Sequence, residues 1–160
     1  GTEASGTGNM KFALNGALTI GTWDGANIEM AEAVGAEHLF VFGLRAEEVR
    51  QRKQQGYEPR REVERLPALR GVLDAIAGGA FSHGESDRYR GIVDSLLHRD
   101  TYMLLADFED YLAAQARVDA LWRDPARWAR VALLNVAGMG RFSADRTIRD
   151  YAEEIWRCLD

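Results

Sequence analysis

The sequence predicts an α/β fold that continues into a mostly helical region. Two short apolar runs rich in β-branched or aromatic residues, 17–22 and 39–42, have the pattern of buried parallel strands. Segments with helical patterns precede, separate and follow them, and this alternation is typical of a doubly wound sheet. We therefore expect residues 1–57 to form an α/β part and residues 58–160 a mainly helical remainder of the same domain.

Glycines mark the ends of most predicted elements in the α/β part, and half of the 16 glycines lie between Gly1 and Gly43. Glycine adopts left-handed backbone angles at little cost, so it commonly follows the last turn of a helix. Thr22 or Asp24 is the expected cap of the second helix. The predicted elements are helix 11–15, strand 17–22, a helix ending near Ala33 before Gly35, strand 39–42, and helix 46–55 before Gly56.

The mainly helical remainder is predicted from the amphipathic spacing of its apolar residues. The expected elements are a charged connection at 58–64, helix 67–77, a loop at 81–87, a helix capped by Asp87, an extended segment at 102–106, helix 108–122, helix 125–137 capped by Asp124, and a last helix capped by Ser143. The last helix is expected to bury one face, which comprises Ile148, Tyr151, Ala152, Ile155 and Trp156.

The most distinctive stretch is the first twelve residues, Gly-Thr-Glu-Ala-Ser-Gly-Thr-Gly-Asn-Met-Lys-Phe. They predict a loop that leads into a helix, with Thr7 or Asn9 as its N-cap. Gly6 and Gly8 allow a ligand to come close to the main chain, and the backbone N–H groups at the start of a helix favour an anion. The stretch therefore predicts an anion-binding loop.

Lys11 lies four residues after Thr7, so both side chains would project from one face of a helix. Between Met10 and Phe12 its amine is expected to be poorly solvated, which favours the neutral form that attacks an aldehyde. The other lysine, Lys53, lies in a polar helical segment and should stay protonated. A phosphate and an aldehyde on one molecule would satisfy the loop and the amine together, and pyridoxal phosphate carries both.

Two common phosphate motifs do not fit these residues. In the P-loop pattern a lysine follows the second glycine, but Thr7 stands there after Gly1 and Gly6. The dinucleotide fingerprint starts at Gly6 and Gly8, yet Lys11 occupies the position of its last glycine.

Residues 3–12, 14–22 and 24–29 resemble the pyridoxal-phosphate segment of the α-glucan phosphorylases, which comprise the glycogen, starch and maltodextrin phosphorylases. The similarity continues through 38–43 and 142–148, so it covers essentially the whole chain. A ten-residue match that includes the lysine is far more specific than a pattern of spaced glycines. The resemblance implies the C-terminal part of a doubly wound, Rossmann-like domain of the GT-B type.

The resemblance also implies an activity and a cofactor. The enzyme would be a glycosyltransferase that uses orthophosphate to release glucose 1-phosphate from the non-reducing ends of α-1,4-glucans. Lys11 would hold pyridoxal 5'-phosphate as a Schiff base, and Thr7 and Gly8 would bind the cofactor's phosphate. Residues 1–57 would then carry both cofactor and glucose.

A glucose subsite is implied just before the cofactor-binding residues. Glu3 would accept a sugar hydroxyl, and the lining would consist of Glu3, Ala4, Ser5 and Gly6. Glu3 and Lys11 are therefore the residues expected to take part in catalysis. Without the resemblance, Glu3 would be interpreted as an ordinary loop carboxylate.

The chain is expected to be a fragment, because family members are several times longer than 160 residues and this chain lacks an initiator methionine. The missing N-terminal part would supply the basic residues for the substrate phosphate and the pocket for the cofactor ring. The isolated fragment should be inactive, and the full-length enzyme is expected to be a homodimer.

Composition excludes several other classes of protein. Net charge is −5, hydrophobic content is 46%, and no apolar run reaches the ~18 residues that span a bilayer, so membrane insertion is not expected. The arginines are spread among acids, which gives nucleic-acid binding no support. A single cysteine, Cys158, agrees with a cytoplasmic protein. No histidine has a second ligand at metal spacing, so no metal is expected.

Alternatives remain open at this point. The chain is either the phosphorylase fragment, a non-catalytic α/β-helical binding or structural fragment, or a different enzyme that forms an imine with Lys11. Asp24, Asn27 and Glu29 suggest acid–base chemistry, but a helix N-terminus with favourably placed acids is the preferred interpretation. Trp122 and Trp128 suit sugar stacking, although core packing is preferred for aromatic residues at helical spacing.

Overall fold

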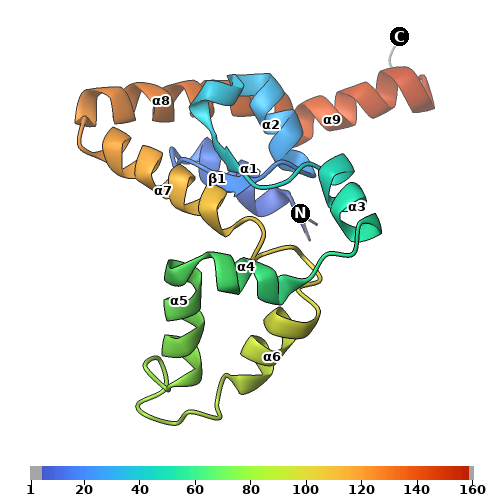
Figure 1. The fold of residues 1–160 in the computed structure, drawn as a ribbon. Helices are drawn as coiled ribbons and strands as arrows, with labels where there is room; N and C mark the ends of the chain where they lie inside the picture. The colour runs from blue at the N-terminus through green and yellow to red at the C-terminus, as the bar shows by residue number, and fades with distance from the viewer. Residues whose placement is uncertain (1–4, 159–160) are drawn as a thin grey trace. The chain divides into compact units, whose positions relative to one another are not determined.

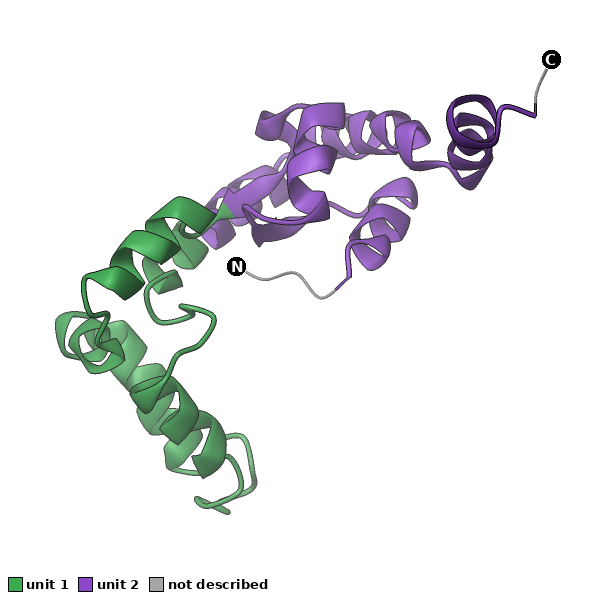
Figure 2. Cartoon of the chain, turned by 90° about the vertical axis from the view of Figure 1, so that its right-hand side faces the viewer, with its two compact units in different colours: residues 1, 42–113 green, residues 2–41, 114–160 purple. Residues whose placement is uncertain are grey.

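The structure is a computed structural model that describes residues 5–158. The described chain divides into two compact units, shown in Figure 2. Unit 1 comprises residues 42–113, and unit 2 comprises residues 5–41 together with 114–158.

Unit 2 contains the small sheet and the first helices of the chain. Strands β1 (Ile20–Thr22) and β2 (Phe40–Phe42) form a two-stranded parallel sheet. Phe40 N–H also donates to the carbonyl of Thr19, the residue directly before β1 (3.0 Å). The α/β prediction is therefore confirmed in its coarse form, as a mixed helical fold with a small parallel sheet. Both strands are shorter than the apolar runs that predicted them.

The other described elements of unit 2 are helical. They are α1 (Thr7–Leu14), α2 (Ala26–Val34), η1 (Ala36–His38), α8 (Pro125–Gly138), η2 (Met139–Phe142), α9 (Ala144–Asp150), the π-helical turn η3 (Tyr151–Trp156) and the second half of α7 (Phe108–Trp122). The helices α1, α2 and α8 pack together (Figure 1). Their buried contacts come from Ala13, Met30, Ala31, Leu39 and Met139, with Met10 and Trp23 packed against them. Met30 and Trp23 are thus packing residues.

Unit 1 consists of helices joined by turns and loops, and the end of β2 at Phe42 is its only strand residue among those described. Its helices are α3 (Ala46–Gln54), α4 (Pro59–Arg65), α5 (Pro67–Ala77), α6 (Arg90–His98) and the first turns of α7. Leu69, Leu73 and Leu105 form its buried core. The predicted helices 46–55, 67–77 and 108–122 are confirmed within one residue.

The glycine signals for helix ends are also confirmed. Gly16, Gly35 and Gly56 have φ angles of 85°, 91° and 83° and directly follow α1, α2 and α3 or their capping residue. After α1, Gly16 N–H donates to Ala13 O and Ala17 N–H donates to Phe12 O, both at 3.0 Å. This pair of bonds satisfies carbonyls that the helix end would otherwise leave open.

The predicted side-chain caps are confirmed at the starts of α8 and α9. Asp124 accepts from Arg127 N–H (3.0 Å) before α8, and Ser143 accepts from Arg146 N–H (3.2 Å) before α9. The other predicted caps are wrong. Gly6, Gly25 and Tyr89 occupy the N-cap positions of α1, α2 and α6, instead of Thr7 or Asn9, Thr22 or Asp24, and Asp87.

The charged segment 58–64 was predicted as a connection, but it forms most of α4. Pro59 occupies the first helical position, where its missing N–H costs nothing. Glu62 then pairs with Arg52 (3.0 Å) and with Arg65 (2.8 Å), so the charges of this segment stabilise a helix.

The segment 102–106 was predicted to be extended, but it forms successive turns around Asp100. The Asp100 carboxylate accepts from the N–H groups of Leu104 (2.8 Å) and Leu105 (2.9 Å) and from the Tyr57 hydroxyl (2.7 Å). Burial and this hydrogen bond raise the pKa of Tyr57, so its hydroxyl stays a donor. One buried carboxylate therefore organises the whole turn.

Apolar side chains near the end of the chain are more exposed than predicted. Ala152 is buried, but Ile148, Tyr151, Ile155 and Trp156 are exposed, so the predicted buried face of the last helix is wrong in this structure. Trp122 is 66% exposed and meets Trp128 edge to face with ring centroids 4.9 Å apart, so the core interpretation is wrong for Trp122. In the described part of the chain, no helix has both the length and the apolar character that crossing a membrane requires.

Close packing of α8 against α2 predicts a sensitive glycine. A methyl group on Gly138 would collide with the Val34 side chain and lie 3.1 Å from Ala33 O. We expect Gly138→Ala to lower the free energy of unfolding by about 1–3 kcal/mol, as measured by urea titration. Gly140→Ala is the matched control, because a methyl group there meets nothing within 4 Å. Equal stabilities of the two variants would contradict this packing.

Candidate functional site

Helix α1 has one buried side and one solvent-facing side. Ala13 is fully buried, and Met10 packs against the same core. At about 100° per residue, Gly8 and Lys11 lie on the opposite side of the helix, and Thr7 lies at its edge, about 40° from Lys11 and about 60° from Met10. Thr7 and Lys11 are exposed. The prediction that Thr7 and Lys11 share a helix face is therefore consistent with the structure, although the helix starts four residues earlier than predicted.

The first turn of α1 provides backbone donors. Its N-cap is Gly6, which has no side chain to accept from the first amides. The amides of Thr7 and Gly8 precede the first internal bond of the helix, from Met10 N–H to Gly6 O (3.2 Å), so they have no acceptor within α1. At the positive end of a helix dipole, N–H groups in this position favour an anion.

Space beside this turn is open. A methyl group placed on Gly8 would meet no atom within 4 Å. The hydroxyls of Ser5 and Thr7 lie 3.1 Å apart and share a hydrogen bond, which places a second kind of donor next to the amides. Amides, hydroxyls and the amine of Lys11 form the donor set that a phosphorylated aldehyde requires, so the residues present fit pyridoxal phosphate.

One sequence-based expectation about Lys11 is wrong for this structure. Its side chain was predicted to be poorly solvated between Met10 and Phe12, but it is exposed, and Phe12 is 69% exposed. The reason is that the helix turns Phe12 towards solvent and only Met10 towards the core. Of the other predicted site residues, Ser5 and Gly6 lie directly before α1, whereas Glu3 and Ala4 lie outside the described residues.

The structure also shows a contact between Asn9 and Asn27 that the sequence did not predict. Asn9 Nδ2 donates to Asn27 Oδ1 (2.9 Å), and Asn27 Nδ2 donates to Thr22 O (3.0 Å). Asn27 is only 4% exposed. The Asn27 amide therefore has a structural role, because it joins α1, β1 and α2. Asn27 is no longer a candidate for acid–base chemistry. A polar residue at a buried position of the predicted helix is the sequence signal that could have pointed to this role of Asn27.

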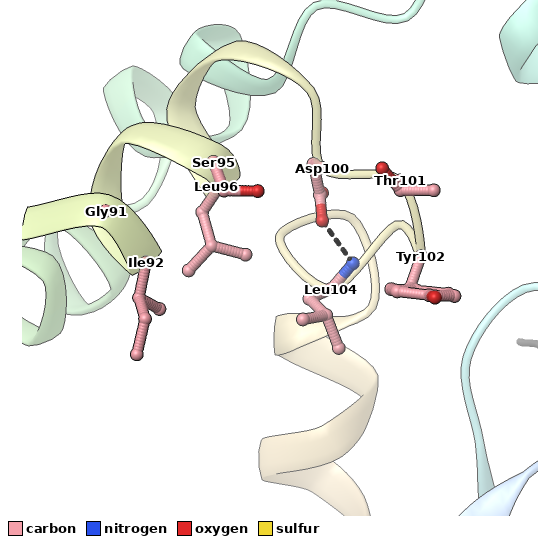
Figure 3. Close-up of a pocket in the computed structure, with 8 residues that line it drawn as sticks. All are labelled: Gly91, Ile92, Ser95, Leu96, Asp100, Thr101, Tyr102 and Leu104. Atoms are coloured by element: carbon pink, nitrogen blue, oxygen red, sulfur yellow. Dashed lines mark hydrogen bonds between the residues drawn. The ribbon is translucent and has the colours of Figure 1, made fainter. Parts of the chain in front are cut away.

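Two hollows in unit 1 contain none of the predicted site residues. The hollow in Figure 3 has a volume of about 320 Å³ and lies between α6, with Ile92 and Leu96, and the turn that carries Tyr102 and Leu104. The other is lined in part by Lys53, Tyr57 and Arg99. Among residues 5–158, no three histidine, cysteine or carboxylate side chains are grouped closely enough to hold a metal ion.

Fold and site together define a mixed helical α/β protein whose first helix begins without a side-chain cap and carries an exposed lysine, Lys11. Comparison with known proteins identifies the family. The model of the carbohydrate phosphorylase family matches residues 1–158, and the chain belongs to that family. The resemblance in the sequence is thereby confirmed at the level of the family.

Several glycogen phosphorylases are similar to the chain. It is 55% identical to the brain form from Bos taurus, 54% to the brain form from Homo sapiens and 52% to the muscle form from Bos taurus. Each alignment covers 156 residues, which are 98% of this chain and 18% of the relative. The chain thus spans about a fifth of the length of these relatives.

Proposed function

We propose that this chain is the cofactor-carrying C-terminal part of a glycogen phosphorylase. The full-length enzyme would be a glycosyltransferase that releases glucose 1-phosphate from the non-reducing ends of α-1,4-glucans with orthophosphate. The observation that carries this proposal is the N-terminus of α1, where the amides of Thr7 and Gly8 have no acceptor within the helix and Lys11 is exposed one turn further on. Family membership and identities above 50% support the same activity.

Each residue of α1 has a defined part in this proposal. The amides of Thr7 and Gly8, with the Thr7 hydroxyl, would bind the phosphate of pyridoxal 5'-phosphate, and Lys11 would attach the cofactor covalently. When bound, the cofactor supplies a phosphate that exchanges a proton with the substrate phosphate. Fixed backbone donors suit that task, because they stabilise the charged phosphate without reorganising.

The glucose subsite would lie immediately before the helix. Glu3 would accept a sugar hydroxyl, and Ala4, Ser5 and Gly6 would offer their main chain. Ser5 and Gly6 are placed suitably for this, since they lead directly into the amides of Thr7 and Gly8. Residues 1–57 would thus carry cofactor and glucose, and residues 58–160 would form the helical remainder of the same GT-B domain.

The remaining polypeptide is the principal partner in this proposal. Phe12, Leu133 and Ile155 are each more than 60% exposed. Because the relatives are about five times longer, we propose that upstream sequence supplies the rest of the active site. The isolated chain would be inactive, and the full-length enzyme would be a cytoplasmic homodimer.

Covalent attachment at Lys11 is the first test. In the full-length polypeptide, incubation with pyridoxal phosphate, reduction with borohydride and peptide mapping should place the label on Lys11. Lys11→Ala should abolish the label and phosphorolysis. Lys53→Ala is the matched control and should keep both, because Lys53 Nζ is engaged with Thr101 O (3.3 Å) in unit 1. Label on Lys53 instead of Lys11 would refute the proposal, and absence of label would favour a non-catalytic fragment.

The open space at Gly8 gives a second test. Gly8→Ala should leave the free energy of unfolding unchanged or raise it by up to about 1 kcal/mol, because alanine favours helix and meets no neighbour. The added methyl group would occupy space needed by the cofactor phosphate, so affinity for pyridoxal phosphate should fall roughly tenfold or more. Gly71→Ala in α5 also meets no neighbour and should leave that affinity unchanged. If Gly8→Ala has the same affinity for pyridoxal phosphate as the wild type, the cofactor phosphate does not bind at this turn.

A further inference from the structure

Asn27 is the residue that ties the first turn of α1 to the sheet. It lies in the first turn of α2 and is 4% exposed. Its Oδ1 accepts from Asn9 Nδ2 (2.9 Å), and its Nδ2 donates to Thr22 O (3.0 Å). One side-chain amide therefore joins α1, the end of β1 and α2.

Gly21 leaves room for this amide. A methyl group on Gly21 would lie 2.6 Å from Asn27 Nδ2, a distance that no ordinary contact allows. Strand β1 thus carries a glycine at the point where the Asn27 side chain crosses it. The close approach lets the amide reach the Thr22 carbonyl without displacing the strand.

Asn9 connects this amide to the proposed cofactor residues. It follows Gly8 directly and precedes Lys11 by two residues, so all three lie within the first five residues of α1. The backbone of one helical turn moves as a unit, and a shift of Asn9 therefore shifts the Gly8 amide and the Lys11 side chain with it. Gly8 and Lys11 depend on Asn9 for their position.

Apolar packing alone would not fix that position. Met10 and Ala13 hold α1 against the core, but apolar contacts have no direction and tolerate small rotations of a helix about its axis. A hydrogen bond has a preferred length and angle, so the Asn9–Asn27 bond selects one rotation. That rotation decides where the open amides and the amine point.

We propose that Asn27 is a positioning residue for the cofactor site, acting through Asn9 on the first turn of α1. This inference rests on the proposed function, because it assigns Asn27 to the same site. It predicts that loss of the amide weakens cofactor binding and changes the environment of the bound cofactor, beyond any general loss of stability.

The test uses the full-length polypeptide and a matched buried asparagine. Asn27→Ala and Asn9→Ala are compared with Asn135→Ala in the same unit. Asn135 is fully buried, and its Nδ2 donates to His38 O (3.1 Å) and Val131 O (3.0 Å), neither of which belongs to α1. Three quantities are measured for each variant: the Kd for pyridoxal phosphate, the absorption spectrum of the bound cofactor and the melting temperature.

We expect Asn27→Ala to raise the Kd roughly tenfold and to shift the cofactor spectrum. Asn135→Ala should lower the melting temperature while leaving Kd and spectrum as in the wild type. Asn9→Ala keeps the buried Asn27 in place and should reproduce the change in Kd even if Asn27→Ala folds poorly. The double variant should be no worse than Asn27→Ala, because both substitutions remove the same bond.

A wild-type Kd and spectrum in Asn9→Ala and in folded Asn27→Ala would overturn the inference. Equal changes in Kd and spectrum in Asn135→Ala would overturn it as well, because they would show that a general loss of stability explains the effect. If the wild-type protein carries no cofactor at Lys11, the proposed function itself has failed. That result is distinguishable because it concerns the unsubstituted chain.

Discussion

The site depends on a single constraint on helix α1, which must be held firmly on one side and left open on the other. Met10 and Ala13 anchor the helix in the core, and Asn9 bonds to Asn27. The N-cap, Gly6, contributes no side chain that could accept from the amides of Thr7 and Gly8. A serine or aspartate at this cap would stabilise the helix and would compete for the donors that the proposed site needs.

Local signals in the sequence were sufficient for much of the fold. Gly16 and Gly35 ended helices because only the backbone of the residue itself decides a left-handed turn. Asp124 capped α8 because its partner lies three residues away. Asn9 was wrongly predicted as a cap, because α1 already begins at Thr7; its Nδ2 instead donates to Asn27, 18 positions further along the chain. A contact over that separation leaves no trace in local spacing.

The candidate site was predictable in its residues but not in its surroundings. Gly8 and Lys11 are three residues apart in the sequence, so helical periodicity predicts that they share one face of a helix. The solvation of Lys11 did not follow, because it depends on which side of α1 faces the core. The comparisons establish the family, and the chain covers 18% of the length of its relatives, so the cofactor site stays a proposal. The role of Asn27 emerged only from packing in three dimensions.

The most direct measurement is a crystal structure of the full-length polypeptide with pyridoxal phosphate bound. The account predicts a covalent link from the cofactor to Lys11 Nζ and cofactor phosphate oxygens within hydrogen-bond distance of the amides of Thr7 and Gly8. A cofactor attached elsewhere, or a phosphate held by side chains away from the first turn of α1, would contradict it.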